Sequence, residues 1–168
     1  SSINGGQTQH FGAEFSLRYD LAAMKKWPFR LPLSVTYTFV PIAEHLNGRY
    51  TGNRIPYSPE HLLSARLSLL LPSGLSATIN GNYVSNQFAD KGNTVSPSLD
   101  GLVGEIPGRF LLDARVSYTF RLPGRGRTLS LFVSGKNLLD ARYIASRRPQ
   151  GIQVGLPRTL YTGVSGSF

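Results

Sequence analysis

The chain contains no cysteine, one methionine and one tryptophan among its 168 residues. Without cysteine, neither a disulfide framework nor a thiolate metal site can form. The three histidines, His10, His45 and His61, are scattered and lack the spacing of metal ligands. No window holds 18 consecutive apolar residues, which excludes a transmembrane helix. A membrane β-barrel would escape such a search, because half of each of its strands faces a polar interior.

Acidic residues are also scarce, with 9 Asp and Glu against 18 Lys and Arg, which gives a formal net charge of +9. This balance implies an anionic partner, which could be nucleic acid, a lipid headgroup or an anionic small molecule. The hydrophobic content of 40% excludes a disordered tail. With 18 glycines, 11 prolines, 8 tyrosines and 9 phenylalanines, the composition favours strands and turns over helices.

Seven segments alternate between apolar and polar residues with a period of two, which is typical of strands with one apolar face. In the first segment, Phe15, Leu17 and Tyr19 share a face, and Ser16 and Arg18 lie on the other. The segments cover residues 10–21, 31–39, 61–71, 75–85, 109–120, 128–137 and 160–168. Each is near the length that a tilted strand needs to cross the apolar core of a bilayer. We therefore predict an all-β, antiparallel sheet.

The connections between these segments alternate in length. Residues 40–60, 86–108 and 138–158 form long loops, whereas 22–30, 72–74 and 121–127 are short. Outer-membrane barrels have short periplasmic turns and long outer loops. The apolar faces also carry two rows of aromatic residues, as expected at membrane interfaces: Tyr19, Tyr118, Phe120 and Phe168 near the short turns, and Tyr37, Phe39, Tyr83 and Phe110 towards the long loops. An odd number of strands predicts that at least one strand precedes Ser1 in the natural protein, because complete bacterial barrels have an even number.

Several segments, in their order along the chain, resemble the C-terminal barrel half of TonB-dependent outer-membrane receptors of the ferric-dicitrate and ferric-siderophore type. They include "NRIPYSPEHLLSARLSL", "IPGRFLLDARVSYTF" and "KNLLDARY", the last followed by "GLPRTLY" and a terminal phenylalanine. The resemblance implies a barrel of about 22 strands, to which residues 1–168 contribute the C-terminal part. It also implies a plug domain, a TonB-binding segment and N-terminal barrel strands that this sequence does not contain.

The resemblance further implies that the bacterial outer membrane is the location and that the ligand is an anionic ferric siderophore, possibly ferric citrate-like. Iron would enter only within this chelate, so we expect no cofactor and no directly bound metal. The expected partners are the TonB complex through the absent N-terminal part, the barrel-assembly machinery, outer-membrane lipid and lipopolysaccharide, but not nucleic acid. Phe168, Val164 and Leu160 would form the signal for assembly, although Gly166 stands where members of the family commonly have an aromatic residue.

Guanidinium groups suit the carboxylate oxygens of such a chelate because they can donate two parallel hydrogen bonds. The candidate ligand-binding residues in the outer loops are Arg147 and Arg148, with Gln150 and Gln153 as neutral donors, and then Arg49 and Arg54. Each could instead be a solvated charge or contact lipopolysaccharide phosphates. The polar face carries a further set of charges that could pair across strands or meet a plug: Glu14, Arg18, Asp20, Arg66, Asp113, Arg115 and Lys136.

Two other interpretations fit the pattern of strands. One is a self-contained outer-membrane barrel of about eight strands that acts as an adhesin, a structural protein or a hydrolase. The other is a soluble basic β domain that binds nucleic acid. No Ser/His/Asp or paired-carboxylate arrangement stands out in the sequence, so we predict no catalysis.

Overall fold

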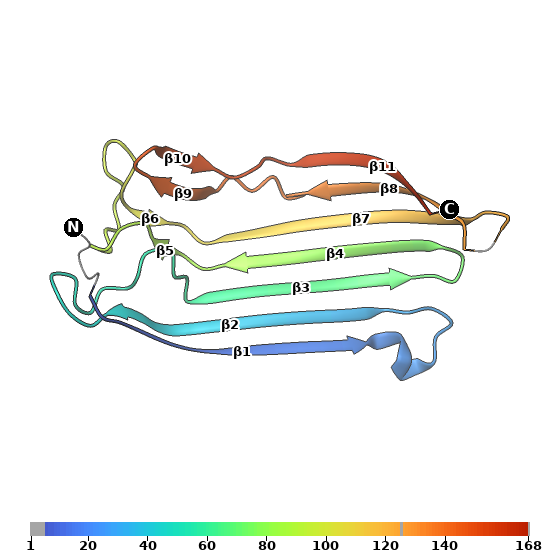
Figure 1. The fold of residues 1–168 in the computed structure, drawn as a ribbon, viewed down its shortest axis with the longest axis horizontal. Coiled ribbons are helices and arrows are strands. Elements are labelled where there is room, and N and C mark those ends of the chain that lie inside the picture. Colours follow the sequence, from blue (N-terminus) through green and yellow to red (C-terminus); the bar gives the residue numbers. More distant parts are fainter. Residues whose placement is uncertain (1–5, 125, 168) are drawn as a thin grey trace.

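The computed structural model describes residues 6–124 and 126–167, and about half of these residues form one antiparallel sheet of seven strands (Figure 1). The strands are β1 (Thr8–Asp20), β2 (Pro32–His45), β3 (His61–Leu70), β4 (Leu75–Val84), β7 (Arg109–Arg121), β8 (Thr128–Lys136) and β11 (Thr159–Ser167). Their spatial order β1-β2-β3-β4-β7-β8-β11 follows the chain, so each strand pairs with the next. The predicted all-β fold and its seven strands are confirmed.

Cross-strand pairing keeps the apolar residues of neighbouring strands on one face. Leu67 lies opposite Leu33 on β2 and opposite Ile79 on β4. One residue earlier on β3, Arg66 lies opposite a serine and an asparagine, which places it on the other face. Because side chains alternate along a strand, a shift by one residue would bring every polar side chain to the apolar face. The period-two pattern therefore specifies the register as well as the strands.

One irregularity interrupts this register. Phe11 on β1 lies opposite Ile42, but Ala13 lies opposite Phe39, so Val40 and Pro41 together face a single residue of β1. This is a β-bulge, which bends the strand and changes its twist locally. Proline has no N–H to donate, so a bulge is one of the few places in a strand that accept it. Beyond the bulge, β2 continues to His45 at the end of the sheet that carries the long loops.

The connections alternate in length, as predicted. At one end of the sheet are a connection with a short 3-10 helix, η1 (Leu21–Lys25), the tight turn 71–74 and the turn 122–127. At the other end, on the left in Figure 1, are the long loops 46–60, 85–108 and 137–158. Two of these loops contain small hairpins that the sequence pattern did not predict: β5 (Gln87–Phe88) with β6 (Glu105–Ile106), and β9 (Ile144–Arg148) with β10 (Gly151–Val154).

The sheet has no second layer over its apolar face among the described residues. The only buried apolar side chains in the described ranges are Ala22 in η1, Ala43 near the end of β2 and Ile106 in loop 85–108, so none lies in the middle of the sheet. In contrast, large apolar side chains on the apolar face are exposed, including 58% of Phe15, 53% of Val133 and 64% of Val164. A sheet with this much exposed apolar surface requires an apolar surrounding on that face. Within 6–124 and 126–167, no helix is long and apolar enough to cross a bilayer.

The opposite face of the sheet is polar, and its side chains form hydrogen bonds between neighbouring strands. Hydroxyl and amide pairs lie 2.7–3.0 Å apart: Ser64 with Asn82, Ser68 with Thr78, Ser76 with Ser117, and Thr119 with Ser130. Phe132 is the one large aromatic residue on the polar side of β8. The Arg115 guanidinium lies 3.7 Å from the centre of its ring, and the ring covers Gly163, where an added Cβ would be 2.5 Å from it. Glycine at this position therefore makes room for the ring.

Candidate functional site

The three long loops lie together at one end of the sheet and are joined by hydrogen bonds. The Tyr57 amide in loop 46–60 donates to the Phe88 carbonyl in loop 85–108 at 2.9 Å. Asn93 in the second loop accepts from the Arg54 amide at 2.6 Å and donates to its carbonyl at 2.7 Å. Tyr57 and Asn93 both have positive φ angles, which asparagine tolerates better than tyrosine. These contacts make the first two loops one connected unit.

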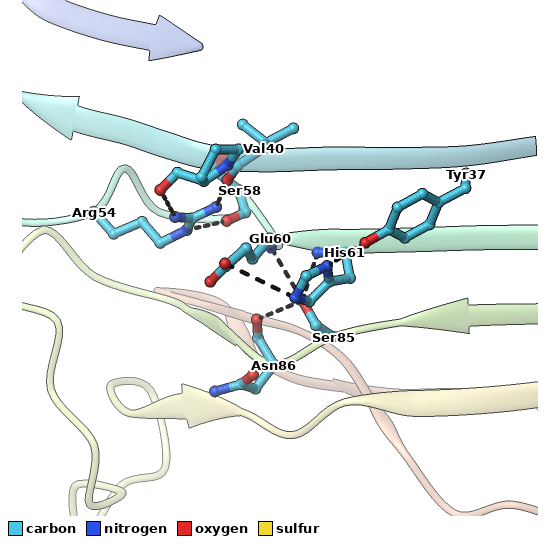
Figure 2. A network of polar contacts seen from close by, with 9 residues as sticks. Tyr37, Val40, Arg54, Ser58, Glu60, His61, Ser85 and Asn86 are labelled. Carbon is cyan, nitrogen blue, oxygen red and sulfur yellow. Dashed lines mark hydrogen bonds and ion pairs between the residues drawn. The ribbon is translucent and has the colours of Figure 1, made fainter. Parts of the chain in front are cut away.

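Arg54, a predicted ligand residue, is engaged with the backbone of the strand and loop beside it (Figure 2). Its Nε donates to the Ser58 carbonyl at 2.7 Å, and its two terminal nitrogens donate to the carbonyls of Pro41 and Val40. Pro41 and Val40 form the β-bulge, so Arg54 supplies donors to carbonyls at the point where the regular ladder is interrupted. The structure therefore gives Arg54 a structural role in joining loop 46–60 to β2.

A second polar network lies where β3 and β4 enter the loops (Figure 2). The Ser85 hydroxyl oxygen accepts from the backbone amides of Glu60 and His61 at 3.0 and 3.1 Å, and it lies 3.3 Å from the Asn86 carbonyl. The His61 ring is 2.9 Å from the Tyr37 hydroxyl through Nδ1 and stacks on Phe39. His61 therefore connects strands rather than standing alone as a candidate ligand.

Arg147, the first-choice candidate, is buried in the β9–β10 hairpin, with only 6% of its surface exposed. One terminal nitrogen donates to the Gly101 carbonyl at 2.5 Å, and the Arg147 carbonyl accepts from the Tyr57 hydroxyl. These two contacts join the third loop to the other two. The Arg147 Nε is buried and has no hydrogen-bond partner among the described residues. Arg147 also forms no ion pair with any described acidic side chain.

Arg148 and the two candidate glutamines lie on the same hairpin but point differently from Arg147. Arg148, the last residue of β9, is exposed. Gln150 is exposed at the tip between β9 and β10, and Gln153 on β10 accepts from the Ser146 hydroxyl at 3.1 Å. The hairpin thus brings four candidates into one element, but the two arginines do not converge on one point. Arg49, in loop 46–60, is exposed with its guanidinium 5.7 Å from the Tyr50 ring centre.

Asn137 begins the third loop and is only 4% exposed. Its side-chain amide donates to the carbonyls of Ala141 and Leu156 at 3.0 and 2.9 Å, and its side-chain oxygen accepts from the Ala141 amide at 2.9 Å. Asp140 then accepts from the Arg158 amide at 3.0 Å, which ties the two ends of the loop together. The "KNLLDARY" motif therefore has a structural basis: asparagine and aspartate replace the missing backbone ladder where β8 and β11 separate.

Asp100 in loop 85–108 also organises backbone. It accepts from the Ser98 hydroxyl at 2.5 Å and from the Leu102 amide at 3.1 Å. These hydrogen bonds, that from Ser98 first, hold the pKa of the Asp100 carboxyl below its usual range. The stabilisation is present above the ordinary aspartate pKa and is lost as the pH falls through the lowered value.

Three of the seven charges predicted on the polar face, Asp20, Asp113 and Lys136, form ion pairs. Lys136 forms an ion pair with Asp113 at 2.6 Å, and the Arg66 Nε donates to the Asn80 side chain at 2.6 Å. Asp20 pairs with Arg30 at 3.0 Å and accepts from the Leu31 amide at 2.9 Å, closing the connection between β1 and β2. Glu14 and Arg18 have no ion-pair partner among the described residues. Arg18 and Arg66 instead line a shallow recess of the polar face near the short turns.

The predicted assembly residues are on the last strand. Val164 and Leu160 on β11 pair with Leu131 and Gly135 of β8, and their exposed side chains lie on the apolar face. Phe168 lies outside the described residues. The sheet is open, with β1 and β11 as its two edges, so the described strands do not close into a barrel by themselves.

Comparison with known proteins gives a consistent relationship. Residues 1–138 match the family described as TonB dependent receptor-like, beta-barrel. The unliganded ferric citrate transporter FecA is 34% identical, with a TM-score of 0.82 over 96% of this chain and 25% of that chain. BauA, the ferric preacinetobactin receptor from Acinetobacter baumannii, is 17% identical, with a TM-score of 0.65 over 95% of this chain and 26% of that chain. The ferric-catecholate import receptor Fiu from E. coli K12 is 22% identical, with a TM-score of 0.63 over 96% of this chain and 21% of that chain. The last two show the fold alone, and the chain spans about a quarter of the length of each protein.

Proposed function

This chain belongs to the TonB-dependent receptor family of β-barrels, and we propose that it serves in TonB-dependent uptake of an anionic ferric chelate of the citrate type across the bacterial outer membrane. Members of this family are transporters rather than enzymes. The observation that carries the substrate class is the 34% identity to a ferric citrate transporter over 96% of the chain. Energy would come from the TonB complex through parts of the receptor outside these 168 residues.

The loop cluster supports an anionic ligand. Arg147 is a buried cation without a paired carboxylate among the described residues, and an uncompensated buried charge costs several kcal/mol. A ligand carboxylate at this hairpin would offset that cost, and Nε is a free donor for it. Arg148 and Gln150 are exposed beside it and can meet the chelate first. We therefore propose that the chelate is recognised at the β9–β10 hairpin, with Gln153 and Arg49 as further donors.

Arg54 has a different place in this proposal. Three of its five N–H donors are occupied by backbone carbonyls, which leaves two for a ligand. Its main contribution would be to hold the loop that packs against the hairpin through Tyr57.

The test is uptake of radiolabelled iron by cells that express the complete receptor and lack their own ferric citrate uptake. We expect uptake of ferric citrate that disappears when TonB is deleted. Replacing Arg148 with alanine should raise the half-saturating chelate concentration about tenfold or more, as expected for loss of a charge-assisted hydrogen bond. Lys91→Ala is the matched control, because it removes an exposed charge of another outer loop.

Two results would contradict the proposal at different levels. If the complete receptor takes up no ferric citrate but imports another ferric chelate, the substrate class is wrong and the transport class stands. If the double variant Arg147→Ala, Arg148→Ala transports and binds ferric citrate as well as Lys91→Ala does, the hairpin is not the recognition site.

A further inference from the structure

The positive charge of the chain is concentrated at the end with the short turns. The long loops 46–60, 85–108 and 137–158 are nearly balanced, with Arg49, Arg54, Lys91, Arg142, Arg147, Arg148 and Arg158 against Glu60, Asp90, Asp100, Glu105 and Asp140. The connection 21–31 and the segment 121–127, which begins with the last residue of β7, contain Lys25, Lys26, Arg30, Arg121, Arg125 and Arg127 and no acidic residue. Six of the nine net charges therefore lie in two short turns, away from the loops proposed to bind the chelate.

Most of these basic groups are free to bind an external anion. Lys25, Lys26, Arg121 and Arg127 are exposed and form no ion pair with any described residue. Arg30 is the exception, because it pairs with Asp20. Figure 1 shows the two turns at the same end of the sheet, opposite the long loops. They come from the β1–β2 and β7–β8 connections, so they form two separate basic clusters along that rim.

Aromatic side chains adjoin both clusters. Trp27 follows the two lysines, stacks on Phe29 with ring centres 5.1 Å apart and is 43% exposed. Tyr118 and Phe120 lie at the end of β7, with ring centres 4.7 Å apart and both rings exposed. Exposed aromatic rings beside basic side chains are typical of the boundary between the apolar core of a membrane and its headgroups. The basic groups are thus placed at the level of lipid phosphates.

We propose that these two basic turns bind the phosphate headgroups of anionic phospholipids in the inner leaflet of the outer membrane. The inference rests on the proposed membrane placement, in which the short turns face the periplasm. Arginine binds phosphate through paired N–H groups, and lysine adds a point charge. Clusters of basic residues beside a membrane-spanning segment attract anionic lipid, and this attraction weakens as salt screens it.

The experiment measures lipid selectivity of the complete receptor in phosphatidylcholine bilayers that contain spin-labelled phosphatidylglycerol or spin-labelled phosphatidylcholine. We expect the wild-type receptor to prefer the labelled phosphatidylglycerol on the order of tenfold at low salt, with the preference reduced at high salt. The test variant combines Lys25→Gln, Lys26→Gln, Arg121→Gln and Arg127→Gln. The matched control removes four exposed outer-loop charges: Arg49→Gln, Lys91→Gln, Arg142→Gln and Arg158→Gln.

Loss of most of the preference in the test variant, with its retention in the control, supports the proposal. An equal preference in both variants, an equal loss in both, or no preference in the wild type would overturn it. If the fourfold variant fails to fold, the pairs Lys25→Gln with Lys26→Gln and Arg121→Gln with Arg127→Gln must each lose part of the preference. The readout contains no iron chelate, so a failed substrate assignment leaves this result unchanged, and a negative lipid result leaves the uptake assay unaffected.

Discussion

Replacing Arg54 with alanine is the most informative perturbation of the loop cluster. The side chain donates to the carbonyls of Ser58, Pro41 and Val40, and hydrogen bonds from a charged donor contribute about 1.5–3 kcal/mol each. Arg54 is only partly buried, so water can rehydrate much of what the variant releases. We therefore expect a local cost of about 3 kcal/mol rather than the full sum, which corresponds to roughly a hundredfold shift in the opening equilibrium.

The assay is amide hydrogen exchange of the complete receptor, read in peptides that cover residues 53–58. The amides of Ile55 and Tyr57 donate to Ala43 and Phe88, so they should exchange roughly a hundredfold faster in the variant. Peptides from β3 should not change, because its ladder does not involve Arg54. Arg49→Ala is the matched control. Equal exchange in the two variants would refute the structural role assigned to Arg54.

Three further predictions concern the sheet and loop 85–108. Asp113→Asn should lower the free energy of unfolding in urea by about 1 kcal/mol at most, because Lys136 is half exposed; a loss above about 3 kcal/mol would show that the pair is more important than its exposure indicates. Gly163→Leu should destabilise the receptor by about 1–3 kcal/mol through its clash with the Phe132 ring, and Phe132→Ala should restore part of the loss in a double-mutant cycle. The amides of loop 85–108 should stay protected from hydrogen exchange, after correction for the intrinsic pH dependence, until the pH falls below the ordinary pKa range of an aspartate. Asp100→Asn should abolish this loss of protection in acid. If the variant loses protection at the same pH as the wild type, another group is responsible.

The strands were predictable because their signal is local. Alternation over segments such as 109–120 specifies both a strand and its apolar face, and the register follows once that face must stay continuous. The alternating loop lengths were equally visible, because Pro72 and Gly74 close a tight turn in three residues while the other end needs more than a dozen. Fold class and the grouping of the long loops at one end therefore followed from the sequence pattern.

The details of the candidate site did not follow, because they depend on contacts between distant residues. Arg54 and Arg147 were indistinguishable in sequence from solvated loop charges, yet one holds a bulge around Pro41 and the other is buried against Gly101. The bulge has no local signature apart from a proline inside a strand. The burial of Arg147 arises only when the hairpin of the third loop meets the second loop.

The total charge was also misleading as a guide to the site. A net charge of +9 indicated an anionic partner but gave no location, and the basic residues in excess lie mainly in the short turns. Only the sheet topology, which puts 21–31 and 121–127 at one end, separates these charges from those of the outer loops.

The central claim is that the apolar face of this sheet meets lipid and the polar face meets an aqueous or protein-filled interior. The most direct measurement is single-cysteine labelling along β8 of a cysteine-free form of the complete receptor in outer membranes, at Leu129, Ser130, Leu131, Phe132 and Val133. We predict that cysteines replacing Leu129, Leu131 and Val133 react with a lipid-soluble reagent and resist a water-soluble one, with the two intervening positions protected from the lipid-soluble reagent. Uniform labelling by the water-soluble reagent at all five positions would contradict the membrane assignment and both proposals that rest on it.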